Sequence, residues 1–217
     1  RSSIAFFYIF KEILKPNMSM TILGDIAQGI YSYKGTNDWD KLNQKVFNNK
    51  ASIEYLKESY RTSIEIMNEA NNIIDKLSDK ENIILAKPIE RHGKEVRHFS
   101  VKNPEEQIDI LYKLLGEQLK DGNKNIAIIT KDFNESIELY NKIDRKLYDI
   151  QLISENISEY KGGMNIIPSY LSKGLEFDSV IIYDKNKYND DVLDTKLLYI
   201  ACTRAMHMLD IIILKKS

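Results

Sequence analysis

The sequence has few of the cysteine and histidine side chains that form disulfide bonds or bind metal ions. Its 217 residues include one cysteine, Cys202, which excludes a disulfide bond within the chain. The three histidines are scattered, and no Cys/His cluster has the spacing of a zinc site. The longest apolar runs reach about half of the length that a membrane-spanning helix needs. We therefore expect no metal site and no membrane partner.

We likewise expect no signal peptide in this sequence. Residues 1–4 have no initiator methionine, and they lack the basic-then-apolar order and the small-residue cleavage site of a signal peptide. We expect this N-terminus to be a cut within a longer protein, and a reducing, cytoplasmic setting. The formal net charge is −1, so binding of nucleic acid would require a local groove.

The order of the predicted elements indicates the fold class. Hydrophobic residues make up 43% and charged residues 29%, which is typical of a globular domain. Strands are predicted at 20–23, 96–101, 125–130, 150–153, 165–167, 179–183 and 208–214. Helices are predicted at 4–14, from about 36, after a capping box at 62–65, and at 103–120, 132–145 and 190–204. This alternation predicts an α/β fold, a parallel sheet with helices on both faces. Ligands of such sheets bind at the carboxyl ends of strands, where we expect the site.

Four segments within this pattern carry notable polar side chains, and each segment alone has an ordinary structural interpretation. Arg61 could form a surface ion pair before a helix, and Arg204 could favour the dipole at a helix end. Gly174 permits an unusual backbone angle between two strands. The segments are residues 24–35, 58–63, 168–178 and 197–205.

The same segments carry side chains suited to nucleotides and nucleic acid. The amide of Gln28 both donates and accepts, so it could orient a water molecule or a phosphate. Tyr33 beside Lys34 offers a stacking face next to a cation, as in single-stranded nucleic-acid sites. Tyr60 and Arg61 place a phenol ring beside a guanidinium that can bind phosphate.

Taken in order, the four segments resemble motifs III, IV, V and VI of UvrD/Rep-like (superfamily 1) helicases. The matches are Gly-Asp-x-x-Gln-x-Ile-Tyr-x-aromatic-basic-Gly at 24–35, Tyr-Arg-(Ser/Thr) at 60–62, Lys-Gly-Leu-Glu-Phe-Asp at 173–178 and Leu-Tyr-x-Ala-x-Thr-Arg-Ala at 198–205. Residues 167–178 and 201–207 are more narrowly similar to the HelD branch, which is related to helicase IV. The resemblance implies a RecA-like domain of the P-loop NTPase type.

The resemblance also implies roles for the matched residues. Gln28, Arg61 and Arg204 would be catalytic and would meet the γ-phosphate of ATP. A guanidinium from a facing domain offsets the charge that builds up on the phosphoryl oxygens. Tyr60 would stack on the adenine, and Glu176 would accept from the ribose hydroxyl. The residues expected to bind the nucleotide are Tyr60, Lys173, Gly174 and Glu176.

Nucleic acid would be contacted by Tyr33, Lys34, Ser169 and Tyr170 in this resemblance. Lys34 stands where the family usually has arginine, which loses bidentate phosphate geometry. Tyr170 stands where a DNA-contacting histidine is typical. That replacement favours a HelD-like protein over a UvrD-like unwinding enzyme.

Two elements of the family's ATP site are missing from the sequence. There is no Gly-x-x-x-x-Gly-Lys-(Ser/Thr) loop and no motif II Asp-Glu pair. ATP with Mg²⁺ would therefore be bound by the intact protein, with the Mg²⁺ ligands outside this chain, and the chain alone would not hydrolyse ATP.

The resemblance also implies the domain organisation. Residues 1–36 are expected to be the end of a first RecA-like domain, and residues 37–217 the second. Only about 34 residues, 131–164, separate two predicted strands, which leaves no room for a large accessory insertion.

Two functions for the intact protein stay open at this point. One is an ATP-dependent DNA helicase or translocase whose partners are single-stranded DNA, or another nucleic acid, and the first RecA-like domain. The other is a HelD-like, ATP-driven factor that recycles RNA polymerase, with this domain as a module that binds the polymerase. A degenerate, inactive RecA-like domain is a third interpretation, disfavoured because Gln28, Arg61, Glu176 and Arg204 are all present.

Overall fold

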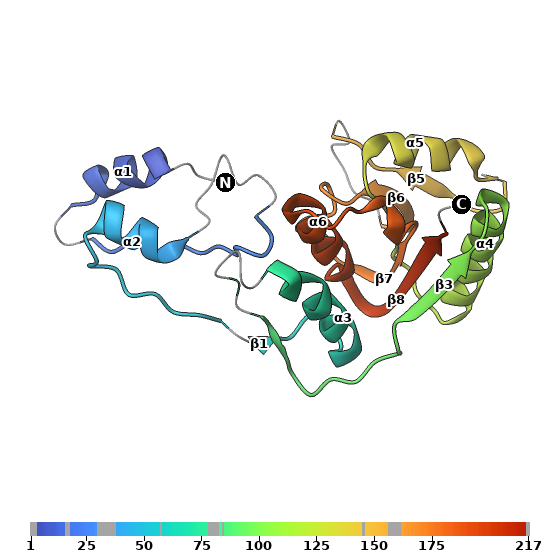
Figure 1. Cartoon of the computed structure of the whole chain (residues 1–217), viewed down its shortest axis with the longest axis horizontal. Helices are drawn as coiled ribbons and strands as arrows, with labels where there is room; N and C mark the ends of the chain where they lie inside the picture. The colour runs from blue at the N-terminus through green and yellow to red at the C-terminus, as the bar shows by residue number, and fades with distance from the viewer. Residues whose placement is uncertain are drawn as a thin grey trace.

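The computed structural model describes residues 4–15, 18–29, 38–56, 58–77, 83, 85–144, 146–155 and 162–215. Tyr33 and Lys34, both expected to contact nucleic acid, lie outside the described residues, as does the expected end of the first helix at 16–17. The described chain has a central sheet layered between helices, with two further helices to one side (Figure 1).

A six-stranded sheet forms the centre of the α/β part, and every strand pair in it is parallel. The strands lie in the order β3-β8-β7-β4-β6-β5. Their bounds are β3 Arg97–Val101, β4 Ile126–Thr130, β5 Ile150–Leu152, β6 Met164–Pro168, β7 Phe177–Ile182 and β8 Ala205–Leu214. The predicted parallel α/β fold is thus confirmed.

Helices cover both faces of the sheet, because the central strands are apolar on both sides. Side chains alternate along a strand, so Ile126 and Ile128 of β4 enter one core while Ala127 and Ile129 enter the other. Helices α4 (Pro104–Lys120) and α5 (Phe133–Lys142) cover the first face. Helices α3 (Ile64–Ile74) and α6 (Val192–Cys202) cover the second.

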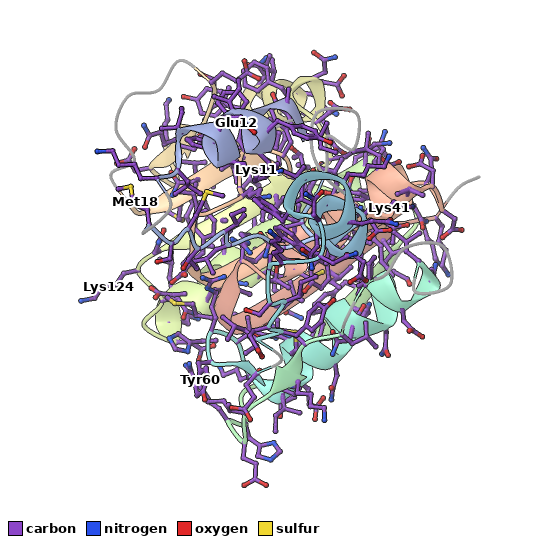
Figure 2. The ribbon with its side chains drawn as sticks, turned by 90° about the vertical axis from the view of Figure 1, so that its left-hand side faces the viewer. Lys11, Glu12, Met18, Lys41, Tyr60 and Lys124 are labelled. Carbon is purple, nitrogen blue, oxygen red and sulfur yellow. The ribbon has the colours of Figure 1, made fainter. Side chains whose placement is uncertain are left out.

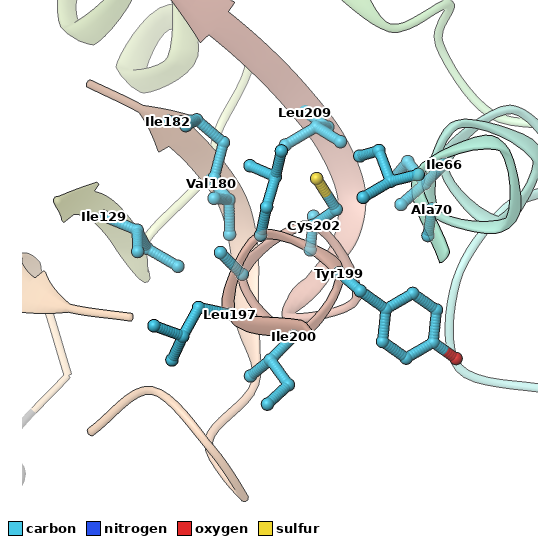
Figure 3. Close-up of a cluster of buried hydrophobic side chains, with 14 of the residues drawn as sticks. Ile66, Ala70, Ile129, Val180, Ile182, Leu197, Tyr199, Ile200, Cys202 and Leu209 are labelled. Atoms are coloured by element: carbon cyan, nitrogen blue, oxygen red, sulfur yellow. The ribbon is translucent and has the colours of Figure 1, made fainter. Parts of the chain in front are cut away.

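Helix α6 lies between the sheet and α3 (Figure 3). Its consecutive residues Leu197 to Cys202 are all buried, unlike those of a surface helix with one apolar stripe. Cys202 points toward Leu209 of β8 and Ile66 of α3 (Figure 3). Burial raises the pKa of its thiol to about 12, so this cysteine is an unreactive core residue.

The helix starts follow the capping rules at most positions. The side chain of Asn103 accepts from the amide of Glu106, with Pro104 at the first position of α4, as predicted. The predicted capping box at 62–65 is wrong, since Ser63 precedes α3 without a side-chain capping bond. Glu65 instead accepts from the amide of Gly93. The segments that precede these two residues form a short parallel strand pair, β1 (Glu58–Ser59) with β2 (Lys87–Pro88), which the sequence did not predict.

The N-terminal region forms a smaller cluster. Helix α1 (Ile4–Ile13) packs its buried Phe7 against Leu42 and Val46 of α2 (Trp39–Phe47). Most of the other apolar side chains of α1 are exposed. The expected domain boundary at 36/37 falls within the undescribed stretch 30–37, between these two helices.

The strand predicted at residues 20–23 is wrong, because this segment is irregular and Leu23 is 84% exposed. A parallel strand requires a neighbour that accepts its hydrogen bonds, and no described strand lies beside this segment. Among the described helices, none combines the length and the apolarity that crossing a membrane demands.

Candidate functional site: an arginine cluster at one edge of the sheet

The crossing from β6 to β7, residues 169–176, carries the segment that resembles motif V. It begins with a compact turn in which Ser172 Oγ donates to the carbonyl of Ser169 at 2.7 Å. Gly174 has a φ of +89°, a left-handed conformation in which a side chain would be strained. This reversal lets the chain reach the start of β7 with Glu176 at the surface.

Glu176 lies against Arg61, which comes from the loop before α3. The distance from Arg61 Nε to Glu176 Oε1 is 2.6 Å, and the two side chains are 45% and 44% exposed. An ion pair this open to water contributes little to stability. It does place a guanidinium and a carboxylate side by side at an accessible edge.

Arg204 lies behind this pair at the end of α6 and is only 2% exposed. Its Nε donates to the carbonyl of Ile200, one terminal nitrogen to the carbonyl of Leu175, and the other to the hydroxyl of Thr203. Among the described residues, no carboxylate forms an ion pair with it. Burial, and next the nearby Arg61, lower the pKa of Arg204 to about 10, so it stays charged at neutral pH.

Arg61, Glu176 and Arg204, here called the arginine cluster, lie at the amino ends of the strands. Glu176 immediately precedes β7 and Arg204 immediately precedes β8. The expectation of a site at the carboxyl ends is therefore wrong for these residues. In a parallel sheet, the connection after each strand must run back across the face of the sheet to the amino end of the next strand. Glu176 and Arg204 stand at the ends of two such connections, so they lie at the amino ends.

Gln28 belongs to a turn at residues 25–29, here called the Gln28 turn. The turn is closed by bonds from the amide of Ala27 to Asp25 Oδ1 and from the amide of Gly29 to the carbonyl of Ile26. Ala27 is buried in the same core as α6. Lys173, expected to bind the nucleotide, donates from Nζ to the carbonyl of Gln28 at 2.7 Å. The structure thus brings the Gln28 turn to the motif V crossing.

Tyr60, expected to stack on adenine, is 67% exposed and lies at the margin of the molecule in Figure 2. Its hydroxyl donates to Glu58 at 2.8 Å, and this bond raises the pKa of Tyr60. The ring face is open to solvent and adjoins Arg61 in sequence. It is therefore available for stacking.

Ser169 and Tyr170, expected to contact nucleic acid, follow the carboxyl end of β6, at the other edge of the sheet from the arginine cluster. Ser169 is buried and donates to the carbonyl of Lys131 at 2.7 Å. Tyr170 is partly buried against the core that includes α6. In this conformation the hydroxyl of Ser169 is occupied within the protein.

Two residues that the sequence did not single out support the loop of Arg61. A terminal nitrogen of Arg91 lies 2.8 Å from His207 Nδ1 at the start of β8. The other donates to the carbonyl of Arg61 at 3.4 Å. His207 lies within the similarity to the HelD branch at 201–207, which was the available signal.

An open pocket of about 690 Å³ lies beside this support, at the amino ends of β7 and β8. The charged groups that border it are mostly paired within the protein, such as Lys94 with Asp121 at 2.6 Å. Its lining includes Ser63, Arg91, Lys94, Asp178, Met206 and His207. No group of three or more His, Cys, Asp or Glu side chains that could hold a metal ion occurs in the described parts of the chain.

Comparisons with known proteins give a likeness of fold. No family model and no curated protein matches the chain. A crystal structure of the C-terminal domain of a possible DNA helicase from Lactobacillus plantarum WCFS1 is similar, with a TM-score of 0.56 and 23% identity, covering 72% of this chain and 88% of that one. The C-terminal part of the Fun30 ATPase domain has a TM-score of 0.35 and 15% identity, covering 99% of this chain and 68% of that one, and no argument rests on it. The first likeness agrees with the RecA-like fold.

Proposed function

We propose that the chain is the C-terminal motor portion of an ATP-dependent, UvrD/Rep-like helicase or translocase. The observation that carries this proposal is the arginine cluster. Four elements distant in sequence place Arg61, Glu176, Arg204 and the Gln28 turn at one edge of the fold. Two neighbouring guanidiniums, one of them without a carboxylate partner among the described residues, favour an anionic ligand there.

The side chains of the cluster are chemically suited to the triphosphate of a nucleotide. A guanidinium has five N–H donors, and the bonds described above use three of those of Arg204. Phosphoryl transfer builds negative charge on oxygens that arginine binds in a bidentate manner. Arg204 is turned inward in this conformation, so its guanidinium would have to rotate past the Arg61–Glu176 pair to reach a phosphate.

The residues present fit only part of a site for ATP with Mg²⁺. Tyr60, Arg61 and Glu176 have accessible side chains for a base, a phosphate and a ribose hydroxyl. The P-loop and the acidic pair would come from a facing RecA-like domain, the expected first domain of the same protein. When bound, Mg²⁺ would neutralise phosphate charge, and its ligands would belong to that domain.

The exposed face of α1 supports such a partner domain. Phe6, Ile9, Phe10 and Ile13 are all more than two-fifths exposed on this helix. An apolar patch of this kind usually marks a protein interface. Because residues 1–36 are expected to be the end of the first RecA-like domain, the proposal assigns this face to packing against the rest of that domain.

The ATPase activity of the full-length protein tests this function and separates it from the HelD-like alternative. Turnover would be measured alone, with single-stranded DNA, and with RNA polymerase. Stimulation by single-stranded DNA supports the translocating helicase, whereas stimulation by polymerase alone favours the recycling factor. A Lys94→Ala variant, which breaks another exposed ion pair at the same edge, is the matched control for Arg61→Ala. Turnover unaffected by any arginine change would contradict both functions.

A second candidate is favoured by the contacts of Arg204 as they stand. Its bonds to Ile200 and Thr203 are those of a residue that closes the end of α6. An inactive RecA-like domain, kept for its structure or for binding RNA polymerase, would need nothing more from this arginine. ATPase turnover of the full-length protein that is unaffected by Arg204→Ala would support an inactive domain, whereas polymerase pull-down that survives Arg61→Ala and Arg204→Ala would support the polymerase-binding role.

A further inference from the structure

Two lysine side chains hold the Gln28 turn against the α/β part. Lys173 Nζ donates to the carbonyl of Gln28 at 2.7 Å, and Lys196 Nζ donates to the carbonyl of Gly29 at 3.4 Å. The acceptors are consecutive in the chain, but the donors come from separate elements. Lys173 belongs to the motif V crossing and Lys196 to α6.

Lys196 is an unusual residue for its position. It is 1% exposed and stands directly before the apolar run 197–202 of α6. An ammonium group removed from water is costly unless it has hydrogen-bond acceptors. The Gln28 turn supplies one, so a displacement of the turn would take an acceptor from a buried charge.

The Gln28 turn lies along the second half of α6. Near the end of the helix, the carboxylate of Asp25 acts electrostatically on Tyr199 and Arg204. At the middle of the helix, Lys196 Nζ reaches the carbonyl of Gly29. The turn therefore lies beside the half of α6 that Arg204 follows.

We propose that Lys196, together with Lys173, is a positioning residue that fixes the backbone of Gln28 at the nucleotide site. Lys196 lies in α6, and Arg204 follows the end of α6 and donates to the carbonyl of Ile200 within it. A shift of this helix therefore moves the support of Gln28 and the arginine together. The inference rests on the proposed function for its catalytic meaning, and its structural core is tested separately.

Amide hydrogen exchange of the purified chain tests the contact itself. Lys196→Met and Lys173→Met remove one ammonium each and keep the aliphatic stem. Loss of a bond to a charged group should speed exchange at Ala27 and Gly29 by about tenfold. The control is Lys76→Met, which breaks an exposed ion pair with Asp190. The fluorescence of Trp39, the single tryptophan, should also shift, because its ring lies against Gly24 at the entry to the turn.

The result that would overturn the contact is exchange in the Gln28 turn equal to that of the control in both lysine variants. Acceleration spread equally over α6 and the sheet would overturn it too, since it would mean general loosening. Lys173 is only partly buried, so Lys173→Met retains the test even if Lys196→Met fails to fold.

Steady-state kinetics of the full-length protein test the positioning role. Lys196→Met should lower kcat by about tenfold with KM unchanged, as Gln28→Ala should, and combining the two should add nothing further. An additive loss would overturn the role. Normal turnover after Arg61→Ala and Arg204→Ala would instead remove the proposed function and leave the exchange result intact.

Discussion

The α/β part and the N-terminal helix pair bury their apolar residues to very different extents. Every residue of β4 is buried, with apolar contacts on both faces. In α1 only Phe7 is buried, and it rests on two residues of α2. The α/β part thus buries its own core, whereas α1 has an exposed apolar face of the kind that usually packs against another protein surface. Substitutions in the two regions test this difference.

The largest effect is expected at Asp210, which lies fully buried in the middle of β8. It accepts two bonds from Arg97 of β3, at 2.7 and 2.9 Å, and one from Gln118 of α4. Asp210→Ala would leave Arg97 with Glu117 alone as its carboxylate partner and would remove the acceptor of the buried Gln118 amide. It should lower the free energy of unfolding by about 3 kcal/mol. Chemical denaturation measures this. The matched control is Asp121→Ala at an exposed ion pair, which should cost under about 1 kcal/mol, and equal losses would contradict the account.

An intermediate effect is expected when the same truncation is made in each region. Val180 in the sheet and Val46 in α2 are both 0% exposed. Val180→Ala should lower the main unfolding free energy by about 2 kcal/mol, because it opens a cavity in the large core. Val46→Ala should speed exchange in α1 and α2 and leave the main transition within about 0.5 kcal/mol. Equal shifts of the main transition would show that the regions unfold as one unit.

The smallest effect is a pH dependence confined to the α/β part. Burial, opposed by a bond from the backbone amide of Lys131, raises the pKa of Glu135 to about 7. A raised carboxyl pKa stabilises the fold at low pH, so this contribution is lost as the pH rises from about 4.5 to about 7. Glu135→Gln keeps an acceptor for Lys131 and should remove the loss, on the order of 1 kcal/mol.

Thermal melts of the wild type and Glu135→Gln between pH 4.5 and 8 measure this difference. Asp38 at the start of α2 should not contribute in this window, because the amide of Lys41 lowers its pKa. Identical pH profiles for the two proteins would refute the assignment to Glu135.

The same contrast explains how much the sequence could predict. Strands β3 to β8 were predictable because β-branched runs pair within the chain. The strand predicted at 20–23 failed because the pattern cannot show whether a pairing neighbour is present. The capping box predicted at 62–65 is wrong because the carboxylate of Glu65 accepts from the amide of Gly93. These residues are 28 positions apart, and a local sequence pattern cannot show such a contact.

The sequence identified the residues of the candidate site better than it predicted how their side chains are arranged. The resemblance named Arg61, Glu176 and Arg204, and the structure places them together, although their roles stay proposals. The inward rotation of Arg204 and the burial of Lys196 depend on tertiary packing. Lys196 could have been noticed as a lone cation beside an apolar helical run.

The most direct test of the central claim is the kcat of full-length Arg61→Ala/Arg204→Ala with saturating ATP and single-stranded DNA. Arginines that stabilise a transferring phosphoryl group contribute about 10³-fold or more. We predict a loss of at least about 10³-fold in kcat. Arg204→Ala also removes three hydrogen bonds at the end of α6, so the melting temperature should fall, and kcat is measured well below the melting transition of the variant. A kcat within threefold of the wild type would show that the arginine cluster serves the fold and not the nucleotide.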